Sequence, residues 1–179
     1  MFEQGEYIVY GSTGVCKVEE VTTMDMDGVP GDKLYYILRP YHKEDREIFT
    51  PVDNKKTKMR KLLSSNEIKS YLKEFKELDD FEITKEKFRE DNYKQCVRGC
   101  DFKEILRLVK SLLKRKRSRF LNGKNFPSTD ERYLKTAENI LFSEISYVLK
   151  LSKNEVRRYL LYEHERDCDN LIYNIKRNQ

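Results

Sequence analysis

The sequence contains no tryptophan, only two histidines, and few glycines and prolines. Two histidines leave little material for a histidine-based acid–base or metal centre, and the motifs G-x-S-x-G, G-x-x-x-x-G-K-[ST] and H-E-x-x-H are all missing. No apolar run approaches the roughly 18 residues that span a bilayer. The first residues have neither the basic nor the apolar region of a secretory signal. We therefore expect a cytoplasmic protein that is not an enzyme, does not bind a membrane, and has no cofactor or small-molecule substrate.

Cysteine is scarce as well, at positions 16, 96, 100 and 168. Without a secretory signal, these residues are expected to be reduced thiols. Cys96 and Cys100 lie four residues apart, as do His164 and Cys168, and two such pairs could in principle form a zinc site. Residues four apart also share one face of a helix, and the C-x2-C turn of many structural zinc sites is missing. We expect small, half-buried side chains on helices and no metal.

Charge is what the sequence has in abundance: 38% of the residues are hydrophobic and 37% are charged, so its cores must be small. Residues 1–64 hold ten of the 36 Lys and Arg residues and eleven of the 31 Asp and Glu residues, a net charge of −1. The remaining 115 residues hold 26 basic and 20 acidic residues, a net charge of +6. Residues 102–124 contain nine Lys or Arg and the single acid Glu104. Such an excess is typical of phosphate contact, although a solvated helix face has the same composition.

The first sixty residues are predicted to form short strands. Residues 6–10 and 15–21 are rich in β-branched and aromatic side chains, and the glycines of the segment 11–14 between them favour a tight hairpin. Further strands are expected at 34–38 and 47–52, with a weaker one at 58–62. Short strands linked in sequence favour a small antiparallel sheet or barrel.

From Ser64 onward the apolar period becomes helical. Four capping boxes predict helix starts, at Ser64/Glu67, Asp101/Glu104, Ser128/Glu131 and Ser152/Glu155. Two apolar stripes predict core faces: Ile105, Leu108, Val109, Leu112 and Leu113 in one helix, and Leu134, Ala137, Leu141 and Ile145 in the next. Another helix is expected over 84–97, and the last one runs from Ser152 toward Ile175. The predicted class is α+β, with a sheet domain at 1–62 and a five-helix domain at 63–179.

Cations and aromatics alternate in the helical half. Lys114 to Arg117, Arg119, Phe120 and Lys124 cluster near one predicted helix end, and Arg132, Tyr133 and Lys135 lie in the next helix. Cations at a helix end also complement its dipole, which explains part of this run. An uncovered amino terminus at Ser128 would offer free N–H groups to a phosphate. No base-reading motif is present, so we predict contact with the backbone and shape of nucleic acid.

Several short motifs follow one another in order. They are Phe2-x-x-Gly5-x-x-Ile8-Val9-Tyr10, Gly14-Val15, Val18-x-x-Val21, Tyr35 to Leu38, Ile48 to Asn54, Lys58-Met59-Arg60, Asp101-x-x-x-Ile105-x-x-x-Val109-x-x-Leu112 and Ser128-x-x-Glu131-x-x-Leu134-x-x-Ala137-x-x-x-Leu141-x-x-Glu144. In this order they resemble the CarD family of transcription regulators. The resemblance implies a Tudor-like domain that binds the RNA polymerase β subunit, similar to the one in transcription-repair coupling factors. It also implies a helical domain that stabilises the open complex at the upstream edge of the melted promoter without reading a sequence.

Carried onto this chain, the resemblance implies that the docking strand is Glu47, Ile48, Phe49, Thr50 and Pro51, whose backbone extends a partner sheet. Phe49 is the expected anchor, although strand alternation alone leaves open whether it faces a partner or the core.

Relatives insert a tryptophan beside the melted DNA, and this chain has none. The matching position falls at residues 83–85, with Phe88 at a neighbouring aromatic position; Phe or Ile can also unstack a base step. The predicted DNA contacts are Lys87, Phe88, Arg89, Lys114, Arg115, Arg117, Arg119, Lys124, Arg132 and Lys135. Two other functions stay open: a free-standing DNA- or RNA-binding protein, and an adaptor that does not touch nucleic acid.

Overall fold

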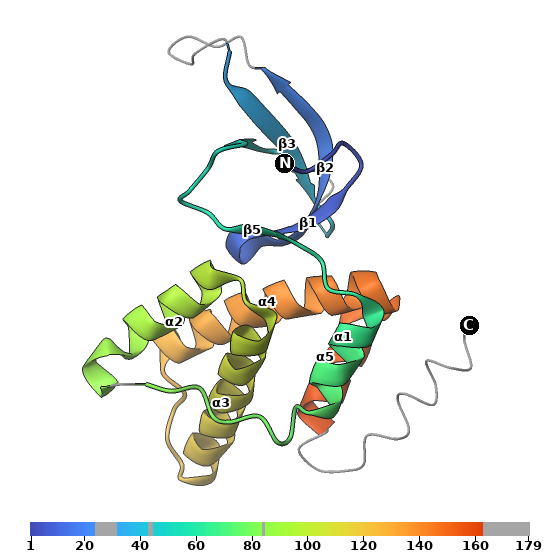
Figure 1. Ribbon diagram of the computed structural model, residues 1–179. Helices are drawn as coiled ribbons and strands as arrows, with labels where there is room; N and C mark the ends of the chain where they lie inside the picture. The colour runs from blue at the N-terminus through green and yellow to red at the C-terminus, as the bar shows by residue number, and fades with distance from the viewer. Residues whose placement is uncertain (24–31, 43–44, 84, 163–179) are drawn as a thin grey trace.

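The computed structural model describes residues 1–23, 32–42, 45–83 and 85–162. Within these ranges a five-stranded antiparallel sheet precedes five α-helices (Figure 1). The strands are β1 (Tyr7–Tyr10), β2 (Gly14–Thr23), β3 (Leu34–Pro40), β4 (Ile48–Pro51) and β5 (Met59–Lys61). The helices are α1 (Ser65–Lys73), α2 (Arg89–Gly99), α3 (Phe102–Leu121), α4 (Ser128–Leu149) and α5 (Lys153–Tyr162), with 3-10 turns η1 (Gly11–Thr13) and η2 (Glu86–Phe88). The predicted α+β class is confirmed.

The strand order is β4-β3-β2-β1-β5, and every neighbouring pair is antiparallel. β1 and β2 form the predicted hairpin, with Ile8 opposite Cys16 and Val9 opposite Val15. Because successive side chains of a strand point to opposite faces, the first pair joins a small sheet core and the second pair joins the core of the helices. Both faces of the hairpin are therefore buried, which explains why the segment Tyr7–Tyr10 contains no charged residue.

Helix starts follow the predicted capping boxes fully at two of four places and by half at a third. Ser64 forms a full capping box, in which its hydroxyl accepts from Glu67 N and its own N–H donates to the Glu67 carboxylate at 2.8 Å. Ser152 makes the same reciprocal pair of bonds with Glu155. Asp101 caps α3 by accepting from Glu104 N at 3.0 Å.

The predicted box at Ser128 is wrong. The Pro127 carbonyl accepts the first intrahelical bond, from Glu131 N at 3.0 Å, so Pro127 takes the capping position and Ser128 is already helical. The helix expected over 84–97 is also shifted, because η2 comes first and α2 begins at Arg89. The predicted extension of the last helix toward Ile175 lies outside the described residues, as do His164 and Cys168.

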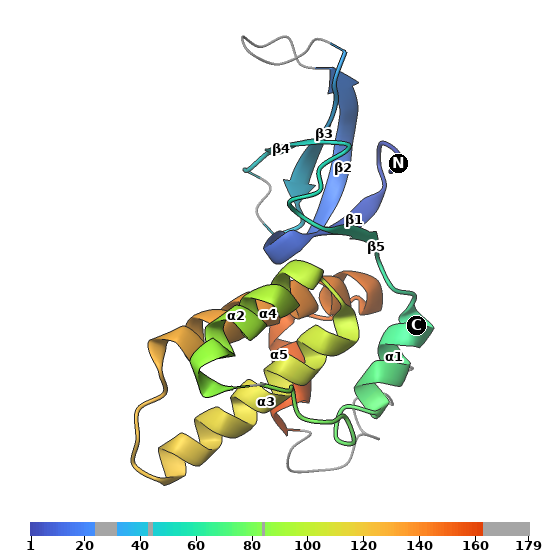
Figure 2. The same ribbon diagram turned by 60° about the vertical axis from the view of Figure 1, so that its left-hand side comes forward.

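The helical core forms mainly between α3 and α4. The two predicted stripes are buried except Leu113, which is half-buried. Figures 1 and 2 show α4 lying across the end of the sheet, while α3 begins beside the sheet and points away from it. One end of the helical domain is thus held against the sheet, and the other end, where α3 finishes, is distal to it.

Candidate functional site

β4 is one edge of the sheet: it pairs with β3 on one side, and no strand of the described residues lies on the other. Phe49 is 50% exposed, while Ile48 is half-buried against the sheet core. An unpaired strand edge can accept a further strand through its free backbone groups. β4 therefore combines a half-exposed aromatic ring with an open backbone edge, and Phe49 is not among the buried residues of the sheet core.

The other residues of the predicted docking strand have different surroundings. Thr50 is 1% exposed and accepts a hydrogen bond from Asn54 Nδ2 at 2.8 Å, so its side chain is structural. Pro51 is half-buried opposite Tyr35 and ends the strand. Glu47 is exposed just before the strand, and its carboxylate is bound by Arg39.

Two of the predicted DNA-contacting cations surround a buried acid. Asp130, in the first turn of α4, is fully buried, and its carboxylate accepts from Arg115 Nε at 2.8 Å. Arg89 Nε lies 3.3 Å from the other carboxylate oxygen as an ion pair. Burial raises the pKa of the adjacent Tyr93 to about 12, and the negative charge of Asp130 adds to this effect. Arg89 and Arg115 thus join the starts of α2 and α4 to α3, which is a structural role.

Three more predicted contacts form ion pairs at the surface. Lys114 Nζ binds Asp80 at 2.6 Å, Arg132 binds Glu90 at 2.5 Å, and Lys135 binds Glu131 at 3.3 Å, one helical turn before it. The pairs are half or more exposed, apart from Glu131 at 46%. Exposed pairs contribute about 0–1 kcal/mol, so a phosphate can displace their carboxylates at little cost.

The remaining predicted contacts lie toward the distal end. Phe88 is 44% exposed, and Lys87 Nζ lies 4.8 Å from the centre of its ring. Arg117 and Lys124 are exposed, and Arg119 donates to the Asn125 carbonyl at 2.6 Å. The predicted DNA contacts thus lie on α3, on the loop that follows it, on η2 and on the beginnings of α2 and α4.

A buried ion pair connects the sheet with the helical domain. Arg60 of β5 binds Glu144 of α4 through two parallel bonds of 2.7 Å, and Leu63 N donates to the same carboxylate at 3.0 Å. The Glu144 side chain is 0% exposed and that of Arg60 19%. Arg60 Nε also donates to the Cys100 carbonyl at 2.6 Å, just before α3. Burial alone would lower the pKa of Arg60, but Glu144 outweighs it and keeps that pKa above its ordinary value.

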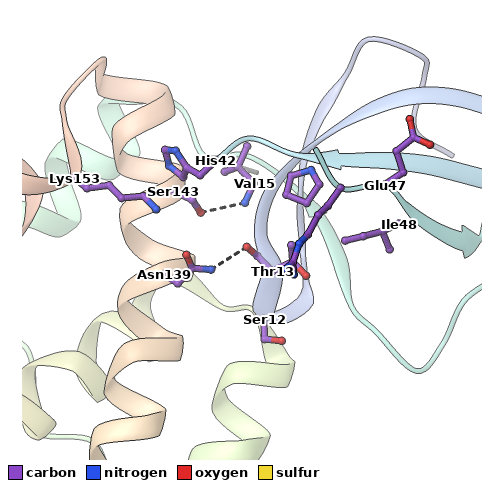
Figure 3. A pocket seen from close by; sticks show the side chains of 11 residues that line it. Ser12, Thr13, Val15, His42, Glu47, Ile48, Asn139, Ser143 and Lys153 are labelled. Carbon is purple, nitrogen blue, oxygen red and sulfur yellow. Dashed lines mark hydrogen bonds between the residues drawn. The ribbon is translucent and has the colours of Figure 1, made fainter. Parts of the chain in front are cut away.

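Backbone and aromatic contacts strengthen the same junction. Val15 N donates to Ser143 Oγ at 3.1 Å, and Asn139 Nδ2 donates to the Thr13 carbonyl at 3.0 Å (Figure 3). The Tyr7 ring stacks on Tyr147 of α4 with 4.4 Å between ring centres. The junction between the sheet and the helices thus combines hydrogen bonds, aromatic packing and a buried charge pair.

A pocket of about 510 Å³ opens beside this junction. Figure 3 shows Asn139, Ser143 and Lys153 on its helical wall and Glu47 and Ile48 on its strand wall. His42 lies beside Ser143 and Lys153 in this view, and burial lowers its pKa, as does the nearby positive charge of Lys153. The pocket is therefore lined both by the start of β4 and by residues of the helices.

Sequence reasoning missed the junction residues. Arg60 and Glu144 are 84 residues apart, so no local pattern joins them. One signal was present: Glu144 lies seven residues after Ala137 and directly before Ile145, within an apolar stripe. An acid at a core position needs a cationic partner, and that requirement could have marked it.

The three cysteines within the described residues are free thiols. Cys16 and Cys100 are buried and Cys96 half-buried, and burial raises the pKa of Cys16 and of Cys96 to about 12. In the described ranges, no three His, Cys, Asp or Glu side chains group as metal ligands. A helix both long enough and apolar enough to cross a bilayer is likewise not found in the described part of the chain.

An open-edged antiparallel sheet is fixed by a buried ion pair to a basic helical region. Two family models match the chain: the CarD-like/TRCF RID domain over residues 2–63 and the CarD C-terminal domain over residues 67–161. The chain belongs to the CarD family, whose members are RNA polymerase-interacting transcription factors. Comparison with curated proteins finds no match. The resemblance based on the ordered motifs is confirmed.

Proposed function

We propose that this protein docks on the RNA polymerase β subunit through the outer edge of β4, with Phe49 as the anchor. Its helical domain contacts promoter DNA at the upstream edge of the bubble without reading a sequence, and thereby changes the stability of the open complex. In this proposal residues 1–62 form the docking domain and residues 63–179 the DNA-contacting domain. The single observation that carries the docking half is the exposed Phe49 ring on an unpaired strand edge.

The docking half follows from what an added strand would gain. Its backbone can bond to β4, and its side chains can cover a half-exposed aromatic ring. Burying the rest of that ring removes apolar surface from water at about 25 cal/mol per Å². A central aromatic side chain of this kind is the typical hot spot of a protein interface. Glu47 precedes this strand and Pro51 ends it, so the edge is short.

The DNA half follows from the arrangement of charge. The residues predicted to contact DNA lie together on the helical domain, and several of them are exposed or form only weak surface pairs. Arg89 and Arg115 are different, because they bind the fully buried Asp130. We therefore assign the phosphate contacts to exposed cations such as Arg117, Lys124 and Lys135, and the positioning of helices to the Asp130 cluster.

The docking test compares Phe49→Ala with a matched control, Leu34→Ala, in the full chain. Leu34 is also an exposed apolar residue of the sheet, at 41%, but it lies on β3 rather than on the outer strand. We expect Phe49→Ala to weaken binding to a β-subunit lobe fragment by about tenfold or more, as loss of a hot spot does. Leu34→Ala should stay within about twofold of the unchanged protein. Equal affinities for both variants, or no binding by the unchanged protein, would refute docking through β4.

Open-complex decay on one promoter tests the DNA half. We expect Arg117→Glu with Lys124→Glu to shorten the lifetime of the open complex while leaving polymerase capture unchanged. A free-standing nucleic-acid binder would instead bind DNA or RNA tightly without polymerase, with affinity that falls steeply with salt. An adaptor would leave the lifetime unaffected by either substitution.

A further inference from the structure

We infer that the end of α3 is a base-stacking contact, in which Phe120 takes up an unpaired base of DNA. Phe120 and Leu121 are framed there by Lys116, Arg119 and Lys124, and these five residues are named the α3 tip. The inference rests on the proposed DNA contact of the helical domain. It specifies that the DNA has unpaired bases and that Phe120 is the side chain that contacts them.

The two apolar side chains of the α3 tip are almost fully in water. Phe120 is 81% exposed and Leu121 73%, well above the 44% of Phe88 and the 50% of Phe49. Singly exposed apolar residues are common on protein surfaces. Two adjacent ones at this level, including an aromatic ring, leave apolar surface that a partner would cover.

The turn that follows α3 is held by specific hydrogen bonds. Asn122 Nδ2 donates to the Ser118 carbonyl at 2.7 Å, and Lys124 N donates to the Arg119 carbonyl at 2.8 Å. Arg119 Nε in turn donates to the Asn125 carbonyl at 2.6 Å, across the turn. Gly123 takes a positive φ of +64°, which favours glycine. The exposed ring is thus presented by an ordered turn rather than by a frayed helix end.

The charge around the ring has one sign. Residues 105–129 contain eight Lys or Arg and no Asp or Glu. Earlier in α3 these cations have partners within the chain: Lys110 Nζ donates to the Leu78 carbonyl, and Lys114 forms a surface pair with Asp80. Among the described residues, Lys116, Arg119 and Lys124 of the α3 tip have no carboxylate partner. Their charge is therefore available to a polyanion.

Nucleic acid fits this combination better than the other occupants. Each nucleotide supplies a flat ring for Phe120 and a phosphate for a neighbouring cation, and such stacking is worth about 1–3 kcal/mol per base. A second copy of the chain would bring another cationic tip against the first, so like charges would oppose that contact. Because an exposed ring at a convex end can stack only on a base that has left its neighbours, the occupant is DNA with unpaired bases.

The position of the α3 tip agrees with this assignment. α3 runs from the junction, where the Cys100 carbonyl accepts from Arg60, to the end farthest from the sheet (Figures 1 and 2). Arg115 binds Glu86 of η2 at 3.1 Å, so the last turns of α3 lie beside the turn that carries Phe88. Within the described helical residues, Phe88 on η2 and Phe120 at the end of α3 are thus two exposed aromatic rings.

The test uses the full chain and two labelled DNA probes, a fully paired duplex and the same duplex with a central mismatched bubble. Affinities are measured by fluorescence anisotropy at about 50 mM salt, where phosphate contacts are strong. We expect Phe120→Ala to weaken binding to the bubble probe by about fivefold or more and to leave duplex binding unchanged. Phe120→Trp should restore the preference for the bubble. The control Leu34→Ala should bind both probes like the unchanged protein.

The outcomes separate this inference from the proposed function. Arg119→Glu with Lys124→Glu should weaken binding to both probes and reduce its salt dependence. If that variant is weak while Phe120→Ala equals the unchanged protein, base stacking is overturned and the phosphate contact stands. An equal loss on both probes for Phe120→Ala also overturns stacking. If the unchanged protein binds neither probe, the stacking inference is overturned, whereas the proposed function is judged by open-complex decay with polymerase. If sedimentation instead shows a dimer that Phe120→Ala dissolves, the occupant is a second copy.

Discussion

Replacement of Glu144 by glutamine tests whether the sheet and the helical domain form one cooperative unit. Glutamine keeps the volume of the side chain, so the change removes charge and one acceptor without opening a cavity. The unchanged carboxylate is fully buried and accepts three hydrogen bonds, two from Arg60 and one from Leu63 N. After the change, an amide NH₂ group must face one of these donors.

The magnitude follows from the burial of the pair. Removal of one partner of a buried ion pair costs about 3–5 kcal/mol, because the other charge stays in the interior without compensation. Arg60 keeps its bond to the Cys100 carbonyl and is 19% exposed, which places the loss at the lower end of that range. We expect Glu144→Gln to lower the free energy of unfolding by about 3 kcal/mol. This is a large share of the roughly 5–15 kcal/mol of an ordinary protein.

Urea unfolding followed by far-UV circular dichroism and by tyrosine fluorescence measures this loss. The two signals should coincide for the unchanged protein, since Tyr7 and Tyr147 stack across the junction. They should separate for Glu144→Gln as the sheet is released before the helices. Glu131→Gln is the matched control on the same helix, because its pair with Lys135 is exposed and contributes about 0.5 kcal/mol or less. Losses below about 1 kcal/mol for Glu144→Gln, equal to those of the control, would refute the account of the junction.

Two further substitution pairs test the turn and the helix starts. Gly14→Ala should lower the free energy of unfolding by about 3 kcal/mol, because Gly14 has a φ of +88° and an added Cβ would lie 2.3 Å from Ser143 Oγ. Gly123→Ala, at a positive φ but in open space, should lower it by about 1 kcal/mol. Equal losses for the two variants in urea titrations would contradict this. Ser64→Ala should lower stability by about 1 kcal/mol through loss of its helix cap, whereas Ser128→Ala should change stability by less than about 0.5 kcal/mol. A larger loss of melting temperature for Ser128→Ala than for Ser64→Ala would exclude the assigned helix starts.

Most of the fold could be predicted from local sequence patterns. The hairpin of β1 and β2 follows from two apolar runs around turn glycines, and the faces of α3 and α4 follow from their apolar stripes, because these signals lie within one element. The start of α4 was misassigned since two adjacent residues, Pro127 and Ser128, both suit a helix start, and only the backbone bonds tell them apart.

The candidate sites were less predictable. Composition identified the cationic helices, but it could not separate cations that bind a buried acid from those that face water. Asp130 looks like an ordinary first-turn acid in the sequence, yet it is fully buried and holds Arg89 and Arg115. Likewise, alternation along β4 gave no direction for Phe49 until the neighbouring strands were placed. In each case the missing information is a contact between segments distant in the chain.

The open edge of β4 also bears on how the protein avoids sticking to itself. An unpaired strand edge can pair with the same edge of a second copy, which is a route to aggregation. β4 is only four residues long, ends in Pro51, which has no N–H to donate, and is preceded by the charged Glu47. Two copies could therefore share very few ladder bonds. Because β4 is so short, a partner strand must also cover Phe49 to bind. The short edge therefore favours both selective binding and solubility.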